Sequence, residues 1–252
     1  CKMKQLIISV SLAIFGAYGL SAQIQPDFTE WQNPEINQIG RIPAHTDLEI
    51  KKDSPFYISL NGLWKFSWAE HANQRAEDFF KTGFDDSSWD YMPVPGNWEL
   101  NGFGDPVYIN IGYPWRGWYK DAPPCVPIEN NHVGSYRKTF QIPEQWKGMQ
   151  IRLHIGSATS NIYVWCNGEF VGYSEDSKME AEFDVTEFIK KGENLFAMQI
   201  FRWCDGTYLE DQDYIRLSGI GRDCYLYALP EKHISDIRIT TPLSDDYRTA
   251  DM

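Results

Sequence analysis

Short apolar runs separated by turn-forming residues dominate the chain from residue 57 onward. In residues 151–155 (IRLHI), apolar and polar side chains alternate with a period of two, which is typical of a strand with one buried face. Residues 194–202 are apolar on both faces, as expected for a strand in the centre of a sandwich. The pair Asn167-Gly168 between residues 161–166 and 169–171 predicts a tight β-hairpin. Further strands are expected at 136–142, 183–185 and 224–229.

Because long helical periods are absent from the sequence, this pattern predicts an all-β sandwich. The sequence also divides into segments of different character. Residues 23–55 are polar and proline-dotted and are expected to form an extended arm, in which Trp31 docks onto the body of the protein. Asn61-Gly62 either turns a hairpin or enters a strand. Residues 99–133 are irregular, but their aromatic content argues against disorder.

The predicted sandwich occupies residues 56–230, and Pro230 is the expected boundary. Beyond it, residues 234–241 alternate like one more strand. One strand cannot form a domain, so residues 231–252 are expected to be the truncated start of a second domain.

The first residues carry an export pattern. Lys2 and Lys4 precede an apolar run from Leu6 to Leu20, and small residues end at Ala22, so residues 1–22 predict a signal peptide and an exported, periplasmic or extracellular protein. The run is short for a membrane span. Removing it takes two lysines from the 23 basic residues and leaves 21 − 35 = −14 as the formal charge. This charge disfavours nucleic acid and anionic membranes as partners.

The remaining cysteines, Cys125, Cys166, Cys204 and Cys224, match no zinc spacing. Export permits a disulfide, but the last three adjoin apolar runs, where buried free thiols are common. The five histidines also lack metal spacing, and His154 is expected to be a solvated strand residue.

Candidate chemistry is concentrated in residues 202–225 (RWCDGTYLEDQDYIRLSGIGRDCY). This segment places Asp205, Glu210, Asp211 and Asp213 within nine residues, interleaved with tryptophan and tyrosine. Carboxylates beside aromatic faces suit sugar hydroxyls and hard cations. The alternative is an acidic loop neutralised by its own arginines.

Six segments of the chain match a known family: WQNPEINQIGR (31–41), SLNGLWKFSW (59–68), VPGNWELNGFGDPVYINIGYPW (94–115), VGSYRKTFQIP (133–143), WCNGEFVGYSEDSK (165–178) and DGTYLEDQDYIRLSGIGRD (205–223). Through them the chain resembles the N-terminal sugar-binding domain of glycoside hydrolase family 2, and more narrowly the large multidomain β-galactosidases of that family. The resemblance implies a galactose-binding-like jelly-roll sandwich, followed by an immunoglobulin-like domain and a TIM barrel. It also implies retaining hydrolysis of β-galactosides by two glutamates of the barrel, so no catalytic residue is expected in this chain.

The resemblance further implies particular site residues. Asp213 matches a family aspartate that binds the galactose 6-hydroxyl and an active-site Na+, and Asn110 matches an asparagine that reaches the galactosyl hydroxyls. Asp205 matches an acid that helps to bind a peripheral Mg2+ in some relatives, in which a glutamine stands at the position of Glu175. Gly112 departs from the family, which often has a threonine there. Trp165 and Trp203 are expected to pack in the core.

Three functions are left open. The chain is the front part of an exported β-galactosidase that is inactive alone, a free-standing carbohydrate-binding module, or a domain used in assembly. The arm suits subunit contacts in the third case, since the enzymes that the chain resembles are commonly homo-oligomers. The partners expected in the first case are a β-galactoside and the remaining domains of the same polypeptide.

Overall fold

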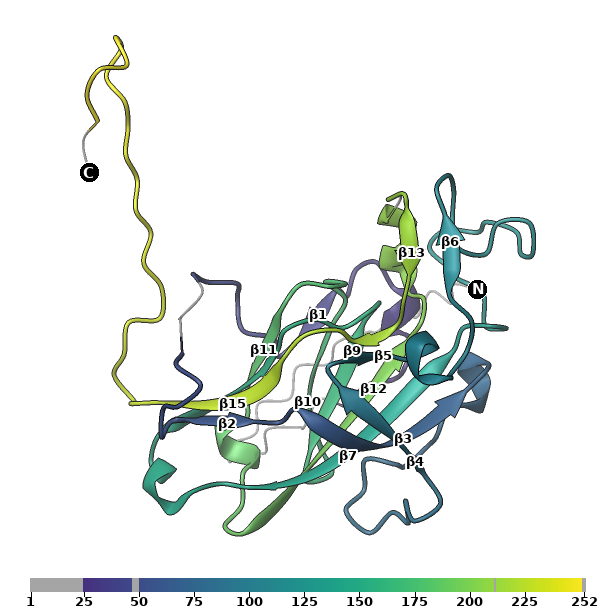
Figure 1. Ribbon diagram of the computed structural model, residues 1–252, viewed down its shortest axis with the longest axis horizontal. Helices are drawn as coiled ribbons and strands as arrows, with labels where there is room; N and C mark the ends of the chain where they lie inside the picture. Colours follow the sequence, from purple (N-terminus) through teal and green to yellow (C-terminus); the bar gives the residue numbers. More distant parts are fainter. Residues whose placement is uncertain (1–24, 47–49, 211, 251–252) are drawn as a thin grey trace, which may run out of the picture.

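The computed structural model describes residues 25–46, 50–210 and 212–250, and these form two antiparallel sheets (Figure 1). The larger sheet has the order β1 (Gln38–Ile39), β10 (Glu169–Ser174), β9 (Ile162–Cys166), β12 (Glu193–Phe201), β7 (Val133–Gln141), β3 (Gly62–Ala69), β4 (Asp90–Val94). The smaller sheet has the order β11 (Ala181–Asp184), β8 (Gln150–Ile155), β15 (Cys224–Leu229), β2 (Tyr57–Ser59). Two short ribbons pair β13 (Tyr214–Arg216) with β6 (Val107–Ile109), and β14 (Gly219–Ile220) with β5 (Gly96–Asn97). The predicted all-β jelly-roll sandwich is confirmed.

Helical structure in the described residues is limited to short 3-10 turns. These are η1 (Glu30–Gln32), η2 (Ala72–Gln74), η3 (Glu99–Asn101), η4 (Glu144–Trp146), η5 (Thr186–Phe188) and η6 (Asp205–Leu209). None of these turns has the length and apolar character that a bilayer-crossing helix needs. The predicted signal peptide, residues 1–22, lies outside the described residues.

The hairpin predicted at Asn167-Gly168 joins β9 to β10. Both turn residues have left-handed backbone conformations, with φ of 54° at Asn167 and 89° at Gly168. Asparagine and glycine tolerate this region best, and such a turn matches the twist of the two strands. Cys166 therefore pairs directly with Glu169. The local sequence sets this register.

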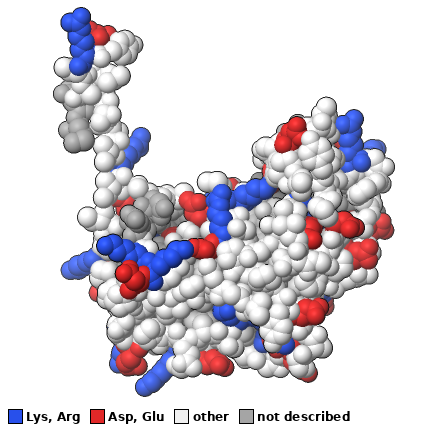
Figure 2. Space-filling view, viewed as in Figure 1, with Lys and Arg blue, Asp and Glu red and all other residues white. Residues whose placement is uncertain are grey.

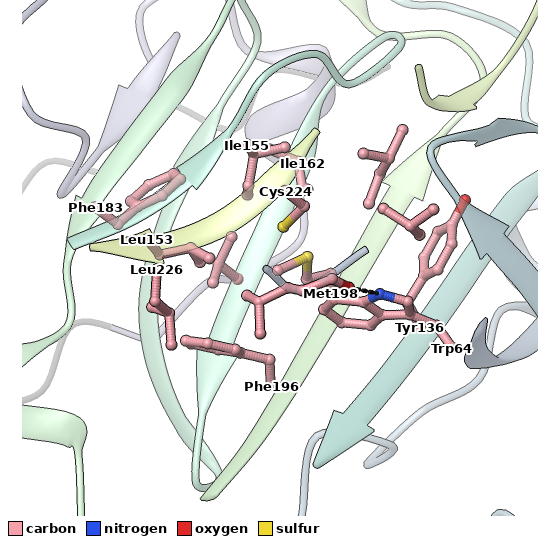
Figure 3. Close-up of a cluster of buried hydrophobic side chains, with 14 of the residues drawn as sticks. Trp64, Tyr136, Leu153, Ile155, Ile162, Phe183, Phe196, Met198, Cys224 and Leu226 are labelled. Atoms are coloured by element: carbon pink, nitrogen blue, oxygen red, sulfur yellow. Dashed lines mark hydrogen bonds between the residues drawn. The ribbon is translucent and has the colours of Figure 1, made fainter. Parts of the chain in front are cut away.

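The core between the sheets explains the alternation along β8. Leu153 and Leu226 of the smaller sheet pack with Phe196 and Met198 of the larger sheet in one buried cluster (Figure 3). Trp64 belongs to the same cluster and is fully buried. Burial of large apolar side chains on both sheets is the main source of stability for such a sandwich.

A second aromatic cluster covers the opposite face of the larger sheet. Trp165 and Tyr163 of β9 and Trp203 are buried there against Trp115 and Trp31 from outside the sheet. Because both faces of the larger sheet are covered, β9 and β12 are apolar on both faces, as the sequence predicted. The expectation that Trp165 and Trp203 are core residues is confirmed.

One ring and one short strand are among the contacts that hold the arm on the sandwich. The Trp31 side chain is buried and stacks on Phe201, with 4.9 Å between the ring centroids. Further along, Gln38–Ile39 pairs with β10 and becomes an edge strand. The predicted docking of Trp31 is confirmed, and the arm is in addition part of the sheet.

Asn61-Gly62 does not turn a hairpin. β2 belongs to the smaller sheet and β3 to the larger, so the chain crosses between sheets at this pair. The Asn61 amide secures the crossing, because its Oδ1 accepts a hydrogen bond from the Cys224 backbone N–H at 2.9 Å. Of the two alternatives, entry into a strand is correct.

Two sequence-based expectations are wrong. Residues 234–241 form no strand; they are exposed and run away from the sandwich (Figure 1), because they make no ladder with other described residues to satisfy their backbone groups. His154 is not a solvated residue: its ring stacks on Tyr225 at 4.3 Å and its Nδ1 lies 2.8 Å from Glu182 Oε1. The alternation of β8 identified which face His154 is on, but that face is covered as well.

Candidate functional site

The two residues expected to contact sugar flank the same end of the β6–β13 ribbon. In this ribbon Tyr214 is paired with Ile109. Asn110 directly follows Ile109 and Asp213 directly precedes Tyr214, so the antiparallel register brings the two polar residues to neighbouring positions. Both are exposed. The structure therefore brings together two residues that are about a hundred positions apart in the sequence.

The ribbon stands away from the body of the sandwich (Figure 1). In the space-filling view it is a separate bulge at the upper right, and a hollow divides it from the C-terminal segment (Figure 2). Large apolar side chains are exposed on the ribbon and its adjoining loops, namely Tyr108, Ile111, Trp118, Leu209 and Ile215. Such an apolar and exposed projection is typical of a surface that meets a ligand or another domain.

Asp213 has one partner on the ribbon itself. The Tyr108 hydroxyl donates a hydrogen bond to Asp213 Oδ1, and this bond raises the pKa of the Tyr108 phenol. A carboxylate has about four lone-pair directions, so one such bond leaves room for a sugar hydroxyl or a cation. The geometry is compatible with both roles expected of Asp213.

Glu210 has a structural role at the base of the ribbon. Its Oε2 lies 2.8 Å from Lys178 Nζ and 3.4 Å from Arg216 Nη1, and its carbonyl accepts a second bond from Arg216 at 2.8 Å. For this residue the alternative of an acid neutralised by nearby basic side chains is correct. Asp211 lies outside the described residues.

The loop after Asn110 has a shape that depends on glycine. Gly112 has a φ of 88°, and a Cβ at this position would lie 3.0 Å from Arg116 Cδ. The Arg116 side chain crosses Gly112 to donate a hydrogen bond to the Ile111 carbonyl at 2.9 Å. Glycine at position 112, where the family often has threonine, leaves room for the Arg116 side chain, and Arg116 in turn fixes the backbone next to Asn110.

A second group of acids lies at the start of η6. Ligand atoms of Glu175, Cys204 and Asp205 lie within 4.8 Å of one another. Asp205 is 6% exposed, and both of its carboxylate oxygens are buried without a hydrogen-bond donor. The Tyr173 hydroxyl donates to Glu175. Two buried carboxylates in contact repel each other unless a proton or a cation lies between them.

The electrostatics of this pair favour a hard cation. Burial, and then the neighbouring Asp205, raises the pKa of Glu175 to about 9, and burial also raises the pKa of Asp205. Burial raises the pKa of the Cys204 thiol too, so it is a poor ligand and the oxygens are left to bind. Oxygen donors with unsatisfied charge are what Mg2+ prefers, so the residues present fit the expected ion.

The sequence did not predict that two acids, Glu30 and Glu182, are buried. Glu30, in the arm, accepts a hydrogen bond from Tyr163 Oη at 3.0 Å, and Glu182 accepts one from Tyr227 Oη at 2.7 Å. The alternation along β11 predicts that Glu182 and Asp184 lie on the same face of the strand. Nothing in the sequence predicts that this face is covered at Glu182.

All four cysteines after the first residue are free, and three of them are buried, so the buried-thiol alternative is correct.

Comparison with known proteins identifies the family of the domain. The sequence profile of the family described as "Glycosyl hydrolases family 2, sugar binding domain" matches residues 57–230. A β-galactosidase of Priestia megaterium is 41% identical over 237 residues, which are 89% of this chain and 23% of that protein. A β-galactosidase of Clostridium acetobutylicum is 40% identical over 235 residues, or 90% of this chain and 26% of that protein. The chain therefore spans about a quarter of the length of these relatives.

Among solved structures, a β-glucuronidase from an uncultured Clostridium sp. superimposes with a TM-score of 0.58. The two sequences are 24% identical, and the match covers 80% of this chain and 34% of that one. At this identity the likeness establishes the fold and no more. On the profile match across its whole sandwich, the chain belongs to the sugar-binding domain family of the family 2 glycosyl hydrolases.

Proposed function

We propose that this chain is part of a β-galactosidase that cleaves terminal β-D-galactosides with retention, and that its β6–β13 ribbon forms the rim of the galactose pocket. The relatives at about 40% identity are named β-galactosidases, and the chain corresponds to about a quarter of their length. The observation that carries the proposal is the placement of Asn110 and Asp213 at one end of an exposed ribbon. The catalytic glutamates would lie in a TIM barrel that this chain does not include.

Each rim residue has a role that follows from its chemistry. The Asn110 amide both donates and accepts hydrogen bonds, as a sugar hydroxyl does. The Asp213 carboxylate would accept a hydrogen bond from the galactose 6-hydroxyl and contribute an oxygen to Na+. Bound Na+ supplies positive charge that orients hydroxyl oxygens. The rim positions and orients the sugar, and bond cleavage is left to the barrel.

Mg2+ would be held by Glu175 and Asp205, where it would replace the proton that the two carboxylates otherwise share. Its role there is structural, because these residues lie next to Cys204 at the start of η6, which leads into the ribbon.

Export to the periplasm or the extracellular space and assembly into a homo-oligomer are also part of the proposal. Export rests on the pattern of residues 1–22, and assembly rests on the family resemblance.

The exposed C-terminal segment favours this reading over a free-standing carbohydrate-binding module. Ile234, Ile237, Ile239 and Leu243 are all more than half exposed. A free module in water has little reason to present these side chains, whereas a neighbouring domain would bury them.

Replacing Asp213 with asparagine tests the proposed rim. In the complete enzyme, Asp213→Asn should lower kcat/KM for an aryl β-galactoside by at least about tenfold, the effect of losing a hydrogen bond to a charged group. It should also weaken the dependence of KM on Na+. Asp90→Asn changes an exposed acid on β4, away from the ribbon, and should leave both quantities unchanged. Unchanged kinetics in Asp213→Asn would remove this residue from the pocket.

A further inference from the structure

The outer face of the smaller sheet carries a cluster of polar side chains around Glu182, which is 9% exposed. His45 Nε2 and His154 Nδ1 each lie 2.8 Å from one of the Glu182 carboxylate oxygens. Tyr227 Oη donates to Oε2 at 2.7 Å, and Arg152 Nη1 lies 4.0 Å from that oxygen. These partners come from the strands β8 and β15 and from the arm, and Glu182 itself lies on β11, so Glu182 joins the arm to the sheet.

The partners of His45 decide the protonation state of its ring. Nε2 faces the Glu182 carboxylate and Nδ1 lies 2.8 Å from the Thr46 carbonyl oxygen. Both groups are acceptors only, and a neutral imidazole can donate from just one nitrogen. The docked position of His45 is therefore satisfied in full only by the imidazolium form.

His233 offers a contrast in the same region. Its Nδ1 lies 2.9 Å from the Pro230 carbonyl oxygen, an acceptor, but its Nε2 lies 3.2 Å from Arg152 Nη2, a donor. One proton on Nδ1 satisfies both contacts, so the neutral ring fits there. Two histidines of one surface thus differ in the charge that their surroundings require.

The charged groups that face His45 also favour a proton on its ring. Glu182 on β11 and Asp236 in the C-terminal segment are acidic, and Arg152 on β8 opposes them. The hydrogen bond to the Thr46 carbonyl, together with Glu182, raises the pKa of His45 although partial burial and Arg152 act to lower it. The neutral phenol of Tyr227 and the His154 ring are the remaining titratable neighbours at Glu182.

The segment that His45 holds is attached to two other parts of the molecule. On the sheet side, the Ile42 N–H donates to the Glu182 carbonyl at 2.8 Å. On the other side, the Thr46 N–H and hydroxyl donate to Asp236 Oδ1 at 2.9 and 2.6 Å. Asp236 belongs to the extended segment that leaves the sandwich. His45 therefore lies where the arm, the sheet and the C-terminal segment meet.

We propose that His45 is a pH-sensitive latch: its doubly protonated ring holds residues 41–46 on the sheet and, through Thr46, holds the segment at Asp236, and loss of one proton loosens both contacts. The direction follows from linkage. A histidine with a raised pKa in the docked state contributes its full stabilisation below its ordinary value of 6.5 and loses it as pH rises through the raised pKa.

Glu182 sets the acid limit of the latch. Its histidine and tyrosine hydrogen bonds outweigh burial and lower its pKa below the usual 4.5, so its contribution is present above that value and is lost as pH falls through the lowered pKa. The latch is thus closed between about pH 4.5 and 6.5 and opens toward alkaline pH.

Amide hydrogen exchange of the chain tests the latch, with protection factors corrected for the intrinsic pH dependence of exchange. The reporters are the Ile42 and Thr46 amides. Between pH 6 and pH 8.5 their protection should fall by about two- to fivefold in the wild type, the range for a partly exposed ion pair. In His45→Gln, which keeps a donor but carries no charge, protection should be low at both pH values.

The matched control is His71→Gln, since His71 contacts the Asn130 N–H at 3.0 Å, away from Glu182. It should retain the wild-type response. The titration of the His45 ring is followed in parallel by NMR, and its midpoint should lie above 6.5 and fall in Glu182→Gln. A wild-type response that is flat with pH, a response preserved in His45→Gln, or a His45 midpoint that Glu182→Gln leaves in place would each overturn the latch.

Discussion

At the scale of single residues, the buried acids are the most informative feature of this domain. Both carboxylate oxygens of Asp205 are buried without a hydrogen-bond partner, and burial raises the pKa of the neighbouring Glu175 to about 9. In Glu175 the folded state binds a proton that the unfolded state releases above pH 4.5, so the metal-free protein should lose stability as pH rises from about 4.5 toward 9. A cation that replaces this proton removes the penalty.

Magnesium should therefore stabilise the protein, and more strongly at pH 8 than at pH 5. The thermal midpoint of the chelator-treated chain should rise on addition of Mg2+, because an ion that binds the folded state alone stabilises it by mass action. Asp205→Asn should abolish this rise. Asp78→Asn, at an exposed acid paired with Lys81, should retain it. If Mg2+ raises the midpoint equally in Asp205→Asn, these acids are not the ligands.

At the scale of elements, local sequence patterns predicted the turn and the strand face that depend on neighbouring residues alone. Asn167-Gly168 predicted the hairpin because the turn conformation is a property of two residues, and the alternation in 151–155 predicted which β8 side chains face the core. The alternation did not predict that His154 is covered, because its cover comes from Glu182 and Tyr225 of other strands. It also predicted a strand at 234–241 that has no pairing partner in the described structure.

Docking of the arm can be measured through its anchoring ring. Trp31 is 6% exposed and stacks on Phe201, so Trp31→Ala should lower the free energy of unfolding by about 3 kcal/mol. Trp118→Ala removes the same side chain from a position that is 67% exposed and should change it by less than about 0.5 kcal/mol. Urea denaturation of both variants gives the comparison. Equal effects would contradict an arm that is part of the folded body.

At the scale of the whole molecule, the sequence predicted the site residues only through the family resemblance. Residues 202–225 showed that acids and aromatic side chains coincide, but spacing alone did not separate Glu210, which neutralises Arg216 and Lys178, from Asp213, which is exposed on the ribbon. The neighbouring positions of Asn110 and Asp213 depend on the β6–β13 register, which is a long-range contact. Such contacts are set by tertiary packing, which no local pattern encodes.

The central claim is that this ribbon contacts the sugar in a larger enzyme. A crystal structure of the complete polypeptide with bound galactose tests it most directly. An Asp213 carboxylate oxygen should lie within hydrogen-bond distance of the 6-hydroxyl or share a Na+ with it, and the Asn110 amide should contact a ring hydroxyl. Galactose bound with both side chains more than about 10 Å away, beyond the reach of a hydrogen bond or one bridging ion, would contradict the account.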